Sequence, residues 1–511
     1  MTPIEALDVQ ARIRPKHIAY ISGHEIWTYS RLAREAERVA QALGARGVRH
    51  GDRVALHMPN VPELAACYYG CLKIGATACP LNIRLKFPEL RPLLIRLRPS
   101  LYIGYGQLYS HVADLGPEIV AADSRFIVGD CVDGWRSWPE FLEAANGEVL
   151  PNVTDINSPA VLLTTSGTTG MVKFVVHTLA TLSAMANMWA HLGLQSDDVV
   201  LHCLPMMHSS GLYTFMACVN SGIRMVLLER FDADVVLDEI ESHCCNWLMG
   251  LPFMFAAVLE RQRTSPRRVE SLRQCVTAGD VCPAELQQEF PHVFGVPLRS
   301  FWASTETVAT TYSARFGAVC RIAPGVQARL IDDDDIEVPR GEVGELLVRG
   351  PNVTLGYWNG PGRIDAVAAD GWFRTGDLMR RGERDDLWFV GRKKDLIIRG
   401  GSNISPVEVE NVLKTHSKVR DAAAFGVPDP VLGQRVAAVV VLSDDATGIT
   451  LNELRVSTMA KLADYKVPEI LKAVSSIPRN ALGKVDRRSL PALLLCGSVE
   501  PTDDDLARIG G

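Results

Sequence analysis

Apolar and polar residues alternate in short runs over roughly the first 300 residues, and these runs predict strands and helices in turn. Residues 53–58 and 76–81 are apolar runs of strand length, and residues 61–73 between them suit a helix. The same succession continues with strands at 198–204, 224–228 and 275–278 and helices at 180–192, 233–242 and 283–290. Strands that alternate with helices of this length favour a layered α/β fold with parallel strands.

The N-terminal segment fits this pattern. Residues 26–30 predict a strand that runs into a helix, with Ser30 as the candidate N-cap and apolar side chains at helical spacing from Leu32 to Leu43. Residues 1–15 mix charged and apolar side chains, which is not typical of a signal peptide.

From about residue 321 the alternation gives way to short strands separated by turns. Strands are expected at 328–331, 344–348 and 387–390, and the acidic run 332–335 is expected to form an exposed hairpin turn. These elements predict a β-rich subdomain after the layered α/β region.

Charge density rises sharply at residues 391–395, which we predict to be a linker. Helices at 406–415 and 451–461 and a strand at 436–442 then suggest a small α+β domain of about 100 residues. The acidic tail is expected to be mobile. The predicted domains are therefore 1–391, a connection at 392–395, 396–496, and a tail at 497–511.

Length and composition narrow the class of protein. A chain of 511 residues is too long for one core, so at least two domains are expected. The net charge of −6, without a basic stretch that interleaves aromatics, argues against a nucleic-acid partner. No window approaches 18 uncharged apolar residues, so no membrane span is expected. The 12 cysteines include no C-x-x-C pair, which favours buried thiols in a reducing cytoplasm over metal ligands.

The stretch richest in candidate chemistry is residues 160–173. An apolar run leads into Thr165-Ser166-Gly167-Thr168-Thr169-Gly170, and Lys173 follows just before a second apolar run. This order predicts a buried strand, a tight loop, and then another strand or a helix. Backbone N–H groups, hydroxyls and a lysine can hold a polyphosphate, although an ordinary Gly/Ser/Thr turn has the same composition. The Walker A spacing is absent.

Four further stretches carry groups suited to a nucleotide. Residues 300–306 include Trp302, Thr305 and Glu306, which can supply a flat ring, a phosphate donor and a Mg²⁺ ligand, or else begin a helix. Asp377 follows a glycine, where its carboxylate can accept two ribose hydroxyls or simply lie in a turn. Residues 391–401 combine several cations with a flexible Gly400-Gly401 pair, although an exposed basic linker has the same composition. Lys484 is expected on a glycine-containing loop, where it could also be an ordinary surface lysine.

These five stretches, in this order, resemble the adenylate-forming superfamily of acyl- and aryl-CoA synthetases, nonribosomal-peptide adenylation domains and luciferases. The resemblance extends from residues 27–29 through 73–76 to Lys484. It implies an α/β fold with a large N-terminal layered α/β domain, a β-rich subdomain, and a small mobile α+β C-terminal domain. It also implies a ligase that forms acyl-AMP and pyrophosphate from a carboxylic acid and ATP, after which a thiol, usually coenzyme A, displaces AMP.

The resemblance assigns roles in the first half-reaction. The family's phosphate loop matches Thr165, Ser166, Gly167, Thr168, Thr169, Gly170 and Lys173. Thr305 is implied to contact the α-phosphate, and Glu306 to bind Mg²⁺. Gly279, Asp280 and Trp302 are implied to flank adenine, and Asp377 with Arg392 to hold the ribose. Lys484 matches the adenylation lysine, which bridges the acyl carboxylate and the α-phosphate and so neutralises charge as they react.

The second half-reaction in the family uses another orientation of the small domain. By position Lys394 matches the hinge, and Gly400-Gly401 matches the strand presented to pantetheine. Lys393, Arg399 and Lys466 are candidate contacts for the phosphates of coenzyme A, although surface lysines are common.

Two departures from the family pattern stand out. Relatives usually end the phosphate loop with Pro-Lys-Gly, whereas this chain has Val172, Lys173 and Phe174. The missing proline removes a φ restraint, and the phenylalanine adds bulk, so either the backbone there is ordinary β or the loop sits differently. Trp302-Ala303 also replaces the usual Tyr-Gly, which narrows the expected acyl pocket.

The acyl pocket is expected to be apolar. Residues 204–212 lack the aspartate with which amino-acid-activating relatives pair the substrate ammonium, and His208 is placed at the pocket mouth. The other candidate lining residues, which also suit a core role, are Gly211, Trp247, Met249, Phe253, Met254, Ala278 and Ala303. An aromatic, alicyclic or medium-chain acid is the predicted substrate.

Two other functions remain open at this point. An enzyme that loads the acyl group onto the phosphopantetheine of an acyl carrier protein shares both half-reactions. A nonenzymatic nucleotide-binding relative is supported only by the departures in the phosphate loop, and Lys484, Thr305, Glu306, Asp377 and Arg392 argue against it.

Overall fold

The computed structural model describes residues 1–145, 147, 155–166, 172–279, 281–307, 310–312, 321–367, 370–383, 385–399, 402–429, 431–443, 450–480 and 483–495. The chain divides into two compact units. The first comprises the described residues of Met1–Arg329, Leu347–Thr375 and Gly382–Trp388. The second comprises Leu330–Leu346, Gly376–Arg381 and the described residues from Phe389 onward. No helix among the described residues is long and apolar enough to cross a membrane.

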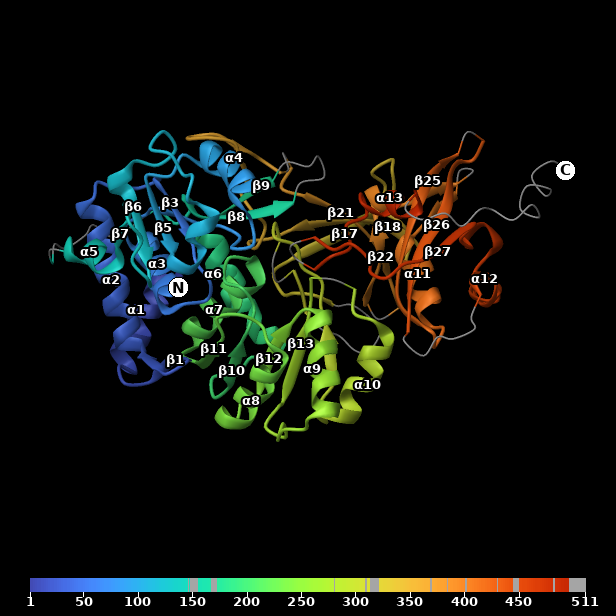
Figure 1. The fold of residues 1–511 in the computed structure, drawn as a ribbon, viewed down its shortest axis with the longest axis horizontal. Coiled ribbons are helices and arrows are strands. Elements are labelled where there is room, and N and C mark those ends of the chain that lie inside the picture. Colours follow the sequence, from blue (N-terminus) through green and yellow to red (C-terminus); the bar gives the residue numbers. More distant parts are fainter. Residues whose placement is uncertain are drawn as a thin grey trace. The chain divides into compact units, whose positions relative to one another are not determined.

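A largely parallel sheet forms one layer of the first unit (Figure 1). Its described strands, in spatial order, are β14 (Leu298–Ser300), β13 (Gln274–Thr277), β12 (Trp247–Gly250), β10 (Val199–His202), β11 (Arg224–Leu227), β1 (Ile18–Ser22) and β2 (Glu25–Thr28). Neighbouring strands run parallel, except that β1 and β2 form an antiparallel pair at one edge. Most of these strand residues are buried, as expected for parallel strands covered on both faces.

The second sheet of this unit carries the stretch at residues 160–173. Its described strands, in order, are β20 (Ile364–Asp365), β19 (Gly356–Trp358), β9 (Val172–Thr178), β8 (Pro159–Ser166), β4 (Thr77–Pro80), β3 (Arg53–His57), β5 (Leu101–Tyr105), β6 (Arg125–Val128) and β7 (Arg136–Ser137). The strands from β8 to β7 run parallel, whereas β8, β9, β19 and β20 pair antiparallel in turn. Figure 1 shows β8 and β9 side by side.

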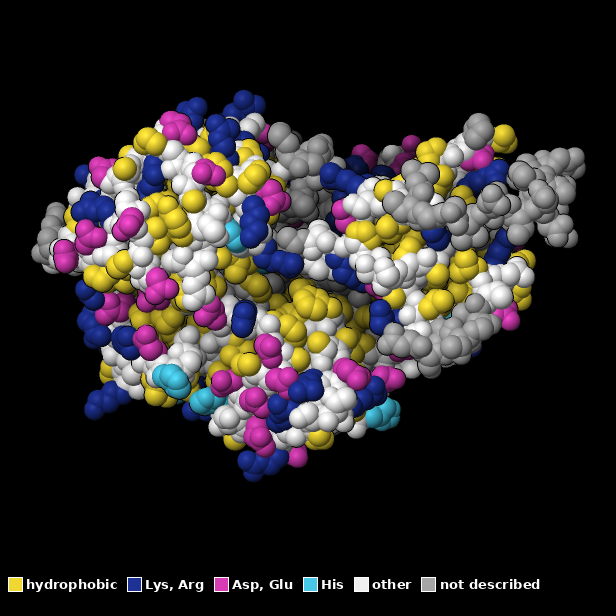
Figure 2. Space-filling model, in the orientation of Figure 1, with side chains coloured by type: hydrophobic (Ala, Val, Ile, Leu, Met, Phe, Trp, Pro, Cys, Tyr) yellow, Lys and Arg dark blue, Asp and Glu magenta, His cyan; other side chains and the backbone are white. Residues whose placement is uncertain are grey.

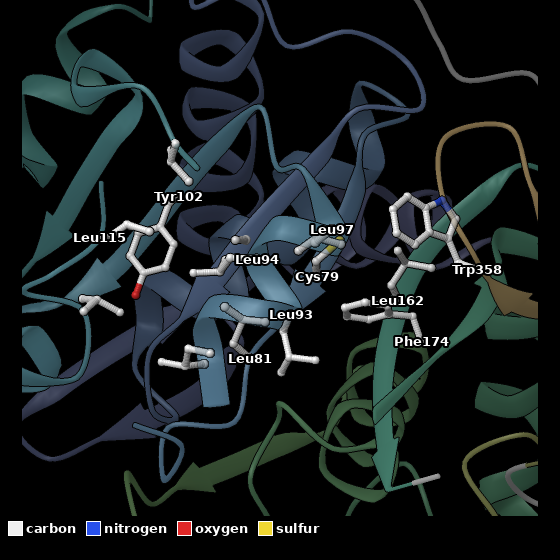
Figure 3. Close-up of a cluster of buried hydrophobic side chains, with 14 of the residues drawn as sticks. Cys79, Leu81, Leu93, Leu94, Leu97, Tyr102, Leu115, Leu162, Phe174 and Trp358 are labelled. Carbon is white, nitrogen blue, oxygen red and sulfur yellow. The ribbon is translucent and has the colours of Figure 1, made fainter. Parts of the chain in front are cut away.

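Helices pack against both sheets. A central group contacts itself and strands of the two sheets: α1 (Pro3–Ile13), α2 (Tyr29–Ala45), α3 (Pro62–Lys73), α6 (Leu179–Met188) and α7 (Ser209–Ser221). An outer group lies on the largely parallel sheet: α8 (Ala233–His243), α9 (Pro252–Thr264) and α10 (Ala284–Phe294). Helix α4 (Phe87–Leu97) buries Leu90, Leu93, Leu94 and Leu97 in the core of the second sheet, and Figure 3 shows Leu93, Leu94 and Leu97 there. The short α5 (Trp138–Glu143) packs on α2 and β6.

The layered α/β architecture predicted from the alternation is confirmed, with local differences. The N-cap of α2 is Thr28, whose side chain accepts from the Arg31 N–H, so the prediction of Ser30 was wrong. The helix predicted to end at residue 192 leaves the α conformation at Met188 and continues as a 3₁₀ turn. Helix α10 continues to Phe294, beyond the predicted residue 290, because Gly295 in the left-handed region ends it.

The β-rich region is also present. Its described strands β17 (Gln327–Ile331), β18 (Val343–Arg349), β21 (Phe373–Arg381) and β22 (Leu387–Arg392) form one sheet, and β15 (Thr311–Tyr312) pairs with β16 (Arg321–Ile322). The Asp332 backbone N–H donates to the Ile336 carbonyl at 2.9 Å, which closes the predicted hairpin turn.

The C-terminal part is α+β, as predicted. One sheet contains β24 (Ser402–Ile404), β23 (Ile397–Arg399), β26 (Gly433–Leu442), β25 (Val419–Asp429) and β27 (Ile470–Ala473). One core cluster includes residues of α11 (Pro406–Lys414) and α12 (Leu451–Met459), and a second includes α13 (Leu490–Leu495). Alternate residues of β25 and β26 belong to different clusters, so the two faces of the sheet are buried separately.

The charged surface residues and the cysteines are distributed as follows. Figure 2 shows acidic and basic side chains interspersed on the visible face. Every described cysteine is a free thiol, and most are buried, whereas Cys131 and Cys244 are exposed.

Candidate active site

The stretch at residues 160–173 forms an antiparallel hairpin. Thr165 pairs with Lys173, and Ser166 pairs with Val172, so the loop between them connects two adjacent strands. Of the two alternatives predicted for the segment after the apolar run, the described residues from Val172 onward form a strand and not a helix. The predicted phosphate-binding residues Gly167, Thr168, Thr169 and Gly170 lie outside the described residues.

Strand β9 presents two different faces. Alternate residues of a strand point to opposite sides, so Lys173, Val175 and His177 share one face, which we call the lysine face. Phe174 and Val176 share the other face and belong to the buried core cluster. Figure 3 shows the rings of Phe174 and Trp358 next to Leu162 in that cluster. The backbone at Phe174 is thus ordinary β, and its ring points away from the lysine face.

On the lysine face, Tyr357 connects Lys173 to Glu306. The Nζ atom of Lys173 lies 4.3 Å from the centroid of the Tyr357 ring. The Tyr357 hydroxyl donates to Glu306 Oε1 at 2.9 Å. Burial, followed by the nearby Glu306 charge, raises the pKa of Tyr357, which keeps the hydroxyl protonated as a donor. The two predicted charged residues are therefore held by one tyrosine.

Backbone contacts fix the segment that carries Thr305 and Glu306. The Nε2 of the buried His177 donates to the Thr305 carbonyl at 2.9 Å. Thr354 adds two links, because its N–H donates to the Glu306 carbonyl at 2.8 Å and its hydroxyl donates to the Val176 carbonyl at 2.5 Å. Strand β9 thus holds this segment directly through His177 and indirectly through Thr354.

One carboxylate oxygen of Glu306 has no hydrogen-bond donor among the described residues. Its Oε1 accepts from Tyr357, whereas Oε2 accepts no hydrogen bond from any described residue. The side chain is half-buried. An anionic oxygen of this kind fits Mg²⁺, which prefers one or two carboxylates together with phosphate oxygens.

The predicted adenine and pocket residues lie at the ends of the parallel strands. Gly279 follows β13 with φ +86°, and a Cβ there would lie 2.7 Å from Leu251 Cδ2. Asp280 lies outside the described residues. Trp302 is 7% exposed, and its backbone N–H donates to Thr311 Oγ1 at 2.9 Å. Ala278 is buried and Ala303 is half-buried.

The remaining pocket candidates lie on or next to α7, in the core and, for Phe253, at the surface. His208 is the N-cap residue of α7 and is half-buried. A Cβ at Gly211 would lie 2.2 Å from the Pro205 carbonyl oxygen, so close packing of α7 requires glycine there. Trp247, Met249 and Met254 are buried, whereas Phe253 is 51% exposed. Their role in binding an acid stays a prediction.

In the second unit, Asp377 and Arg392 form the predicted pair. Arg392 Nε lies 3.1 Å from Asp377 Oδ1, and Asp377 is only 4% exposed. The Gly376 N–H donates to Glu345 Oε1 at 3.3 Å, and Lys393 Nζ donates to Glu345 Oε2 at 3.1 Å. Glu345 therefore fixes both the turn before Asp377 and the residue after Arg392.

The candidate contacts for coenzyme A are engaged in ion pairs. Lys466 Nζ lies 2.8 Å from Glu408 Oε1, Arg399 Nε lies 2.6 Å from Glu469 Oε1, and Lys393 Nζ lies 2.8 Å from Asp333 Oδ1. Any anion bound by these cations would compete with a carboxylate. Gly400 and Gly401 lie outside the described residues.

Lys484 lies on a short loop of the second unit. Its N–H donates to Asn480 Oδ1 at 3.1 Å, and the Asn480 N–H donates to the Lys484 carbonyl at 2.8 Å. These bonds close the loop around Gly483, whose φ is +78°. Asn480 thus holds the backbone of Lys484 in place. Lys394, the candidate hinge, lies in the 3₁₀ turn Lys393–Asp395.

Several residues that hold the predicted site residues were not singled out from the sequence, among them Tyr357, Glu345 and His177. Tyr357 lies in a strand of three residues, which is too short for a periodic signal. Glu345 is an acidic residue within a buried strand, and an acidic residue in an apolar strand is itself a sequence signal of a specific role. His177 is likewise a polar residue within a buried, largely apolar strand, which is the same kind of signal.

Buried histidines predict a loss of stability in mild acid. Burial lowers the pKa of His177 and His202 from 6.5 to about 4, and that of His57 to about 3. The folded-state pKa values are lowered, so the unfolded chain binds more protons, and stability falls as the pH drops from about 6.5 toward 4. Three such groups give a slope of up to about 4 kcal/mol per pH unit within this window.

The measurement is the free energy of unfolding in urea at several pH values between 4 and 7. A His177→Gln variant is expected to reduce the slope of the unfolding free energy against pH by the contribution of about one bound proton. Identical slopes for the wild-type protein and His177→Gln would contradict the lowered pKa assigned to His177.

The comparisons with known proteins cover nearly the whole chain. The family model described as AMP-binding enzyme matches residues 7–358, and the AMP-binding enzyme C-terminal domain matches residues 408–484. An indoleacetate–CoA ligase from Aromatoleum aromaticum is 34% identical over 505 residues, which is 96% of this chain and 98% of that protein.

Solved structures agree with these matches. An anthranilate CoA ligase, AuaEII, in complex with anthranoyl-AMP, has a TM-score of 0.88 at 25% identity and covers 96% of this chain and 97% of that one. ATP-bound MatB from Rhodopseudomonas palustris has a TM-score of 0.83 at 28% identity, with coverage of 96% and 99%.

Proposed function

The chain belongs to the AMP-binding enzyme family, and we propose that it is an ATP-dependent acid–CoA ligase that acts on an apolar carboxylic acid through an acyl-AMP intermediate. The observation that carries the proposal is the arrangement on the lysine face. Lys173, at the end of the phosphate hairpin, and Glu306 are held together by Tyr357. A lysine and a carboxylate at the same place suit a magnesium triphosphate, which needs a cationic partner and an anionic metal ligand.

The first half-reaction joins the acid to AMP. One carboxylate oxygen of the acid forms a bond to the α-phosphorus of ATP, and the bond to the bridging oxygen breaks, so pyrophosphate leaves. Carboxylate and triphosphate repel each other, so catalysis depends on positioning and charge neutralisation. Lys173 neutralises the β- and γ-phosphates, Thr305 donates to the α-phosphate, and Lys484 bridges the carboxylate and the α-phosphate. Mg²⁺, held by Glu306, would supply Lewis-acid stabilisation of the phosphate oxygens.

The residues proposed to bind the nucleoside of ATP are those predicted to contact ribose and adenine. Asp377 is a buried carboxylate that can accept both ribose hydroxyls, and the Arg392 guanidinium forms an ion pair with it. Adenine is assigned to Gly279, Asp280 and Trp302. A side chain at Gly279 would meet Leu251, so packing against Leu251 and the positive φ both favour glycine at this position.

The second half-reaction transfers the acyl group. The thiol sulfur of coenzyme A forms a bond to the acyl carbon, AMP leaves, and the thiol proton is released. We propose domains at 1–391 and 396–496 that change orientation about the hinge at 392–395. Gly400-Gly401 would then contact pantetheine, and Lys466 would contact a phosphate. The many buried free thiols support a reducing compartment such as the cytoplasm.

The acid is proposed to be aromatic, alicyclic or medium-chain. Buried apolar side chains at Trp247, Met249 and Met254, together with the indoleacetate–CoA ligase relative, support this class. The test is a screen of pyrophosphate release across aryl, alicyclic and C4–C16 acids, with and without coenzyme A. Release that depends on one such acid supports the proposal, and release independent of every acid contradicts it.

A carrier protein is the second candidate acceptor. Both acceptors present the same phosphopantetheine thiol, so the active-site residues do not separate them. Parallel assays with coenzyme A and with a holo acyl carrier protein decide the question. Thioester on the carrier with none on coenzyme A would replace the ligase proposal.

The hinge gives a prediction of its own. Lys394→Pro fixes φ at the proposed pivot, so it is expected to reduce thioester formation about tenfold or more while acid-dependent pyrophosphate exchange is retained. Lys394→Ala removes the same side chain without restricting the backbone and serves as the control. Equal loss of both half-reactions in the proline variant would count against rotation at this residue.

A further inference from the structure

Arg96 contacts the end of the phosphate hairpin from a distant part of the chain. It lies near the end of α4, and its Nη1 donates to the Val172 carbonyl at 2.8 Å. Its guanidinium carbon lies 4.7 Å from the centroid of the Phe174 ring. Arg96 therefore holds the residues on either side of Lys173, one through its backbone and one through its side chain.

The Phe174 ring that Arg96 contacts is packed in the buried core. Phe174 is 1% exposed, and its ring meets the Trp358 ring edge-on at 5.8 Å and 84°. Phe174 and Trp358 are direct partners in the β9–β19 register. Leu93, Leu97 and Leu162 belong to the same cluster (Figure 3). The ring against which Arg96 stacks is thus fixed on several sides.

Arg96 makes these contacts without a carboxylate partner in the described part of the chain. No described carboxylate forms an ion pair with it, and its buried Nε has no hydrogen-bond partner among the described residues. Burial lowers its pKa. The contacts with Val172 and Phe174 are therefore the ones that account for an arginine at this half-buried position.

We propose that Arg96 is a positioning residue for the triphosphate: with Phe174, it anchors the exit of the phosphate hairpin and so fixes Lys173. A hydrogen bond and a cation–π contact restrict Val172 and Phe174, where a proline would otherwise restrict the backbone. The register then directs Lys173 to the opposite face, onto Tyr357. This inference rests on the proposed function only in that the hairpin binds ATP.

The test measures binding of MgATP alone by calorimetry, without acid or coenzyme A. Arg96→Ala is expected to raise the dissociation constant about tenfold, the scale of one hydrogen bond from a charged donor. Arg96→Lys keeps a cation and a donor but loses the planar stack, so it is expected to recover part of the affinity. Arg91→Ala removes an exposed arginine from the same helix and is expected to bind as wild type does.

A kinetic readout separates positioning from folding. Arg96→Ala is expected to raise KM for ATP about tenfold and to leave the rate of thioester formation from supplied acyl-AMP unchanged. If the alanine variant does not fold, Phe174→Leu carries the test. It keeps an apolar side chain but removes the cation–π partner, and a rise of about threefold in the dissociation constant is expected.

The outcomes are distinct from those of the ligase proposal. MgATP affinity equal to wild type in folded Arg96→Ala, or in Phe174→Leu if that is the variant used, overturns the inference. Weaker binding in these variants together with absence of acid-dependent exchange in wild type supports the inference and overturns the proposed function. Failure of the wild-type protein to bind MgATP overturns both.

Discussion

Replacing Lys484 with alanine is expected to reduce acid-dependent pyrophosphate exchange by about 10³-fold, because a charge that stabilises the reacting oxygens is removed. Thioester formation from supplied acyl-AMP is expected to survive, since the α-phosphate has already reacted. The loop that carries Lys484 is closed by backbone bonds involving Asn480, so the substitution leaves that backbone support in place. The measurement compares the two half-reactions in one variant.

The control is Lys461→Ala. Lys461 is an exposed lysine of the same unit, and its Nζ donates to Thr415 Oγ1 at 2.7 Å. It is expected to affect neither half-reaction. Exchange that persists in Lys484→Ala would show that the adenylation lysine is another residue.

Glu306→Gln is expected to lower the rate of acyl-AMP formation by about 10²-fold or more and to weaken the apparent affinity for Mg²⁺. Glutamine keeps the shape of the side chain and an oxygen that can accept from Tyr357, so the loss reports the charge. The measurement is a titration of exchange activity with Mg²⁺ at fixed ATP, with the thermal midpoint recorded alongside.

Tyr357→Phe is the matched comparison. It leaves the Glu306 charge and the ring against Lys173, and it removes the hydroxyl bond of 2.9 Å, so a smaller loss of about tenfold is expected. A loss in Tyr357→Phe as large as that in Glu306→Gln, or no change in Mg²⁺ dependence in Glu306→Gln, would contradict the assigned role of the carboxylate.

The fold was largely predictable because its signals are local. The helix at residues 61–73 and its flanking strands lie between Gly51 and Leu81, and the structure places them within a residue or so of the prediction. The exceptions have local causes as well. Thr28 and Ser30 are both suitable caps, and the choice depends on where the strand paired with β1 ends, which is a tertiary property.

The candidate site was predictable as a set of charged residues but not as a geometry. Lys173, Glu306 and Asp377 were found because each lies in a distinctive short motif. Tyr357 and Arg96 were not, because their importance depends on strand register and on a helix packed from far along the chain. Phe174 was an open question in sequence, and the register answers it by placing the ring in the core.

The ion pairs of Lys466 and Arg399 also could not be predicted from the sequence. Lys466 and Arg399 were candidate phosphate contacts on charge alone, yet each lies against a glutamate distant in sequence. Sequence reveals that a cation is present, whereas the fold decides what neutralises it.

The most direct test of the central claim is the fate of a labelled carboxylate oxygen. The acid identified by the screen, labelled with ¹⁸O in both carboxylate oxygens, is converted in the presence of ATP and coenzyme A, and the products are analysed by mass spectrometry. Attack on the α-phosphate predicts that one ¹⁸O appears in AMP and one remains in the thioester. Label in inorganic phosphate, with ADP as the product, would contradict the account, because the acid would then have reacted at the γ-phosphate.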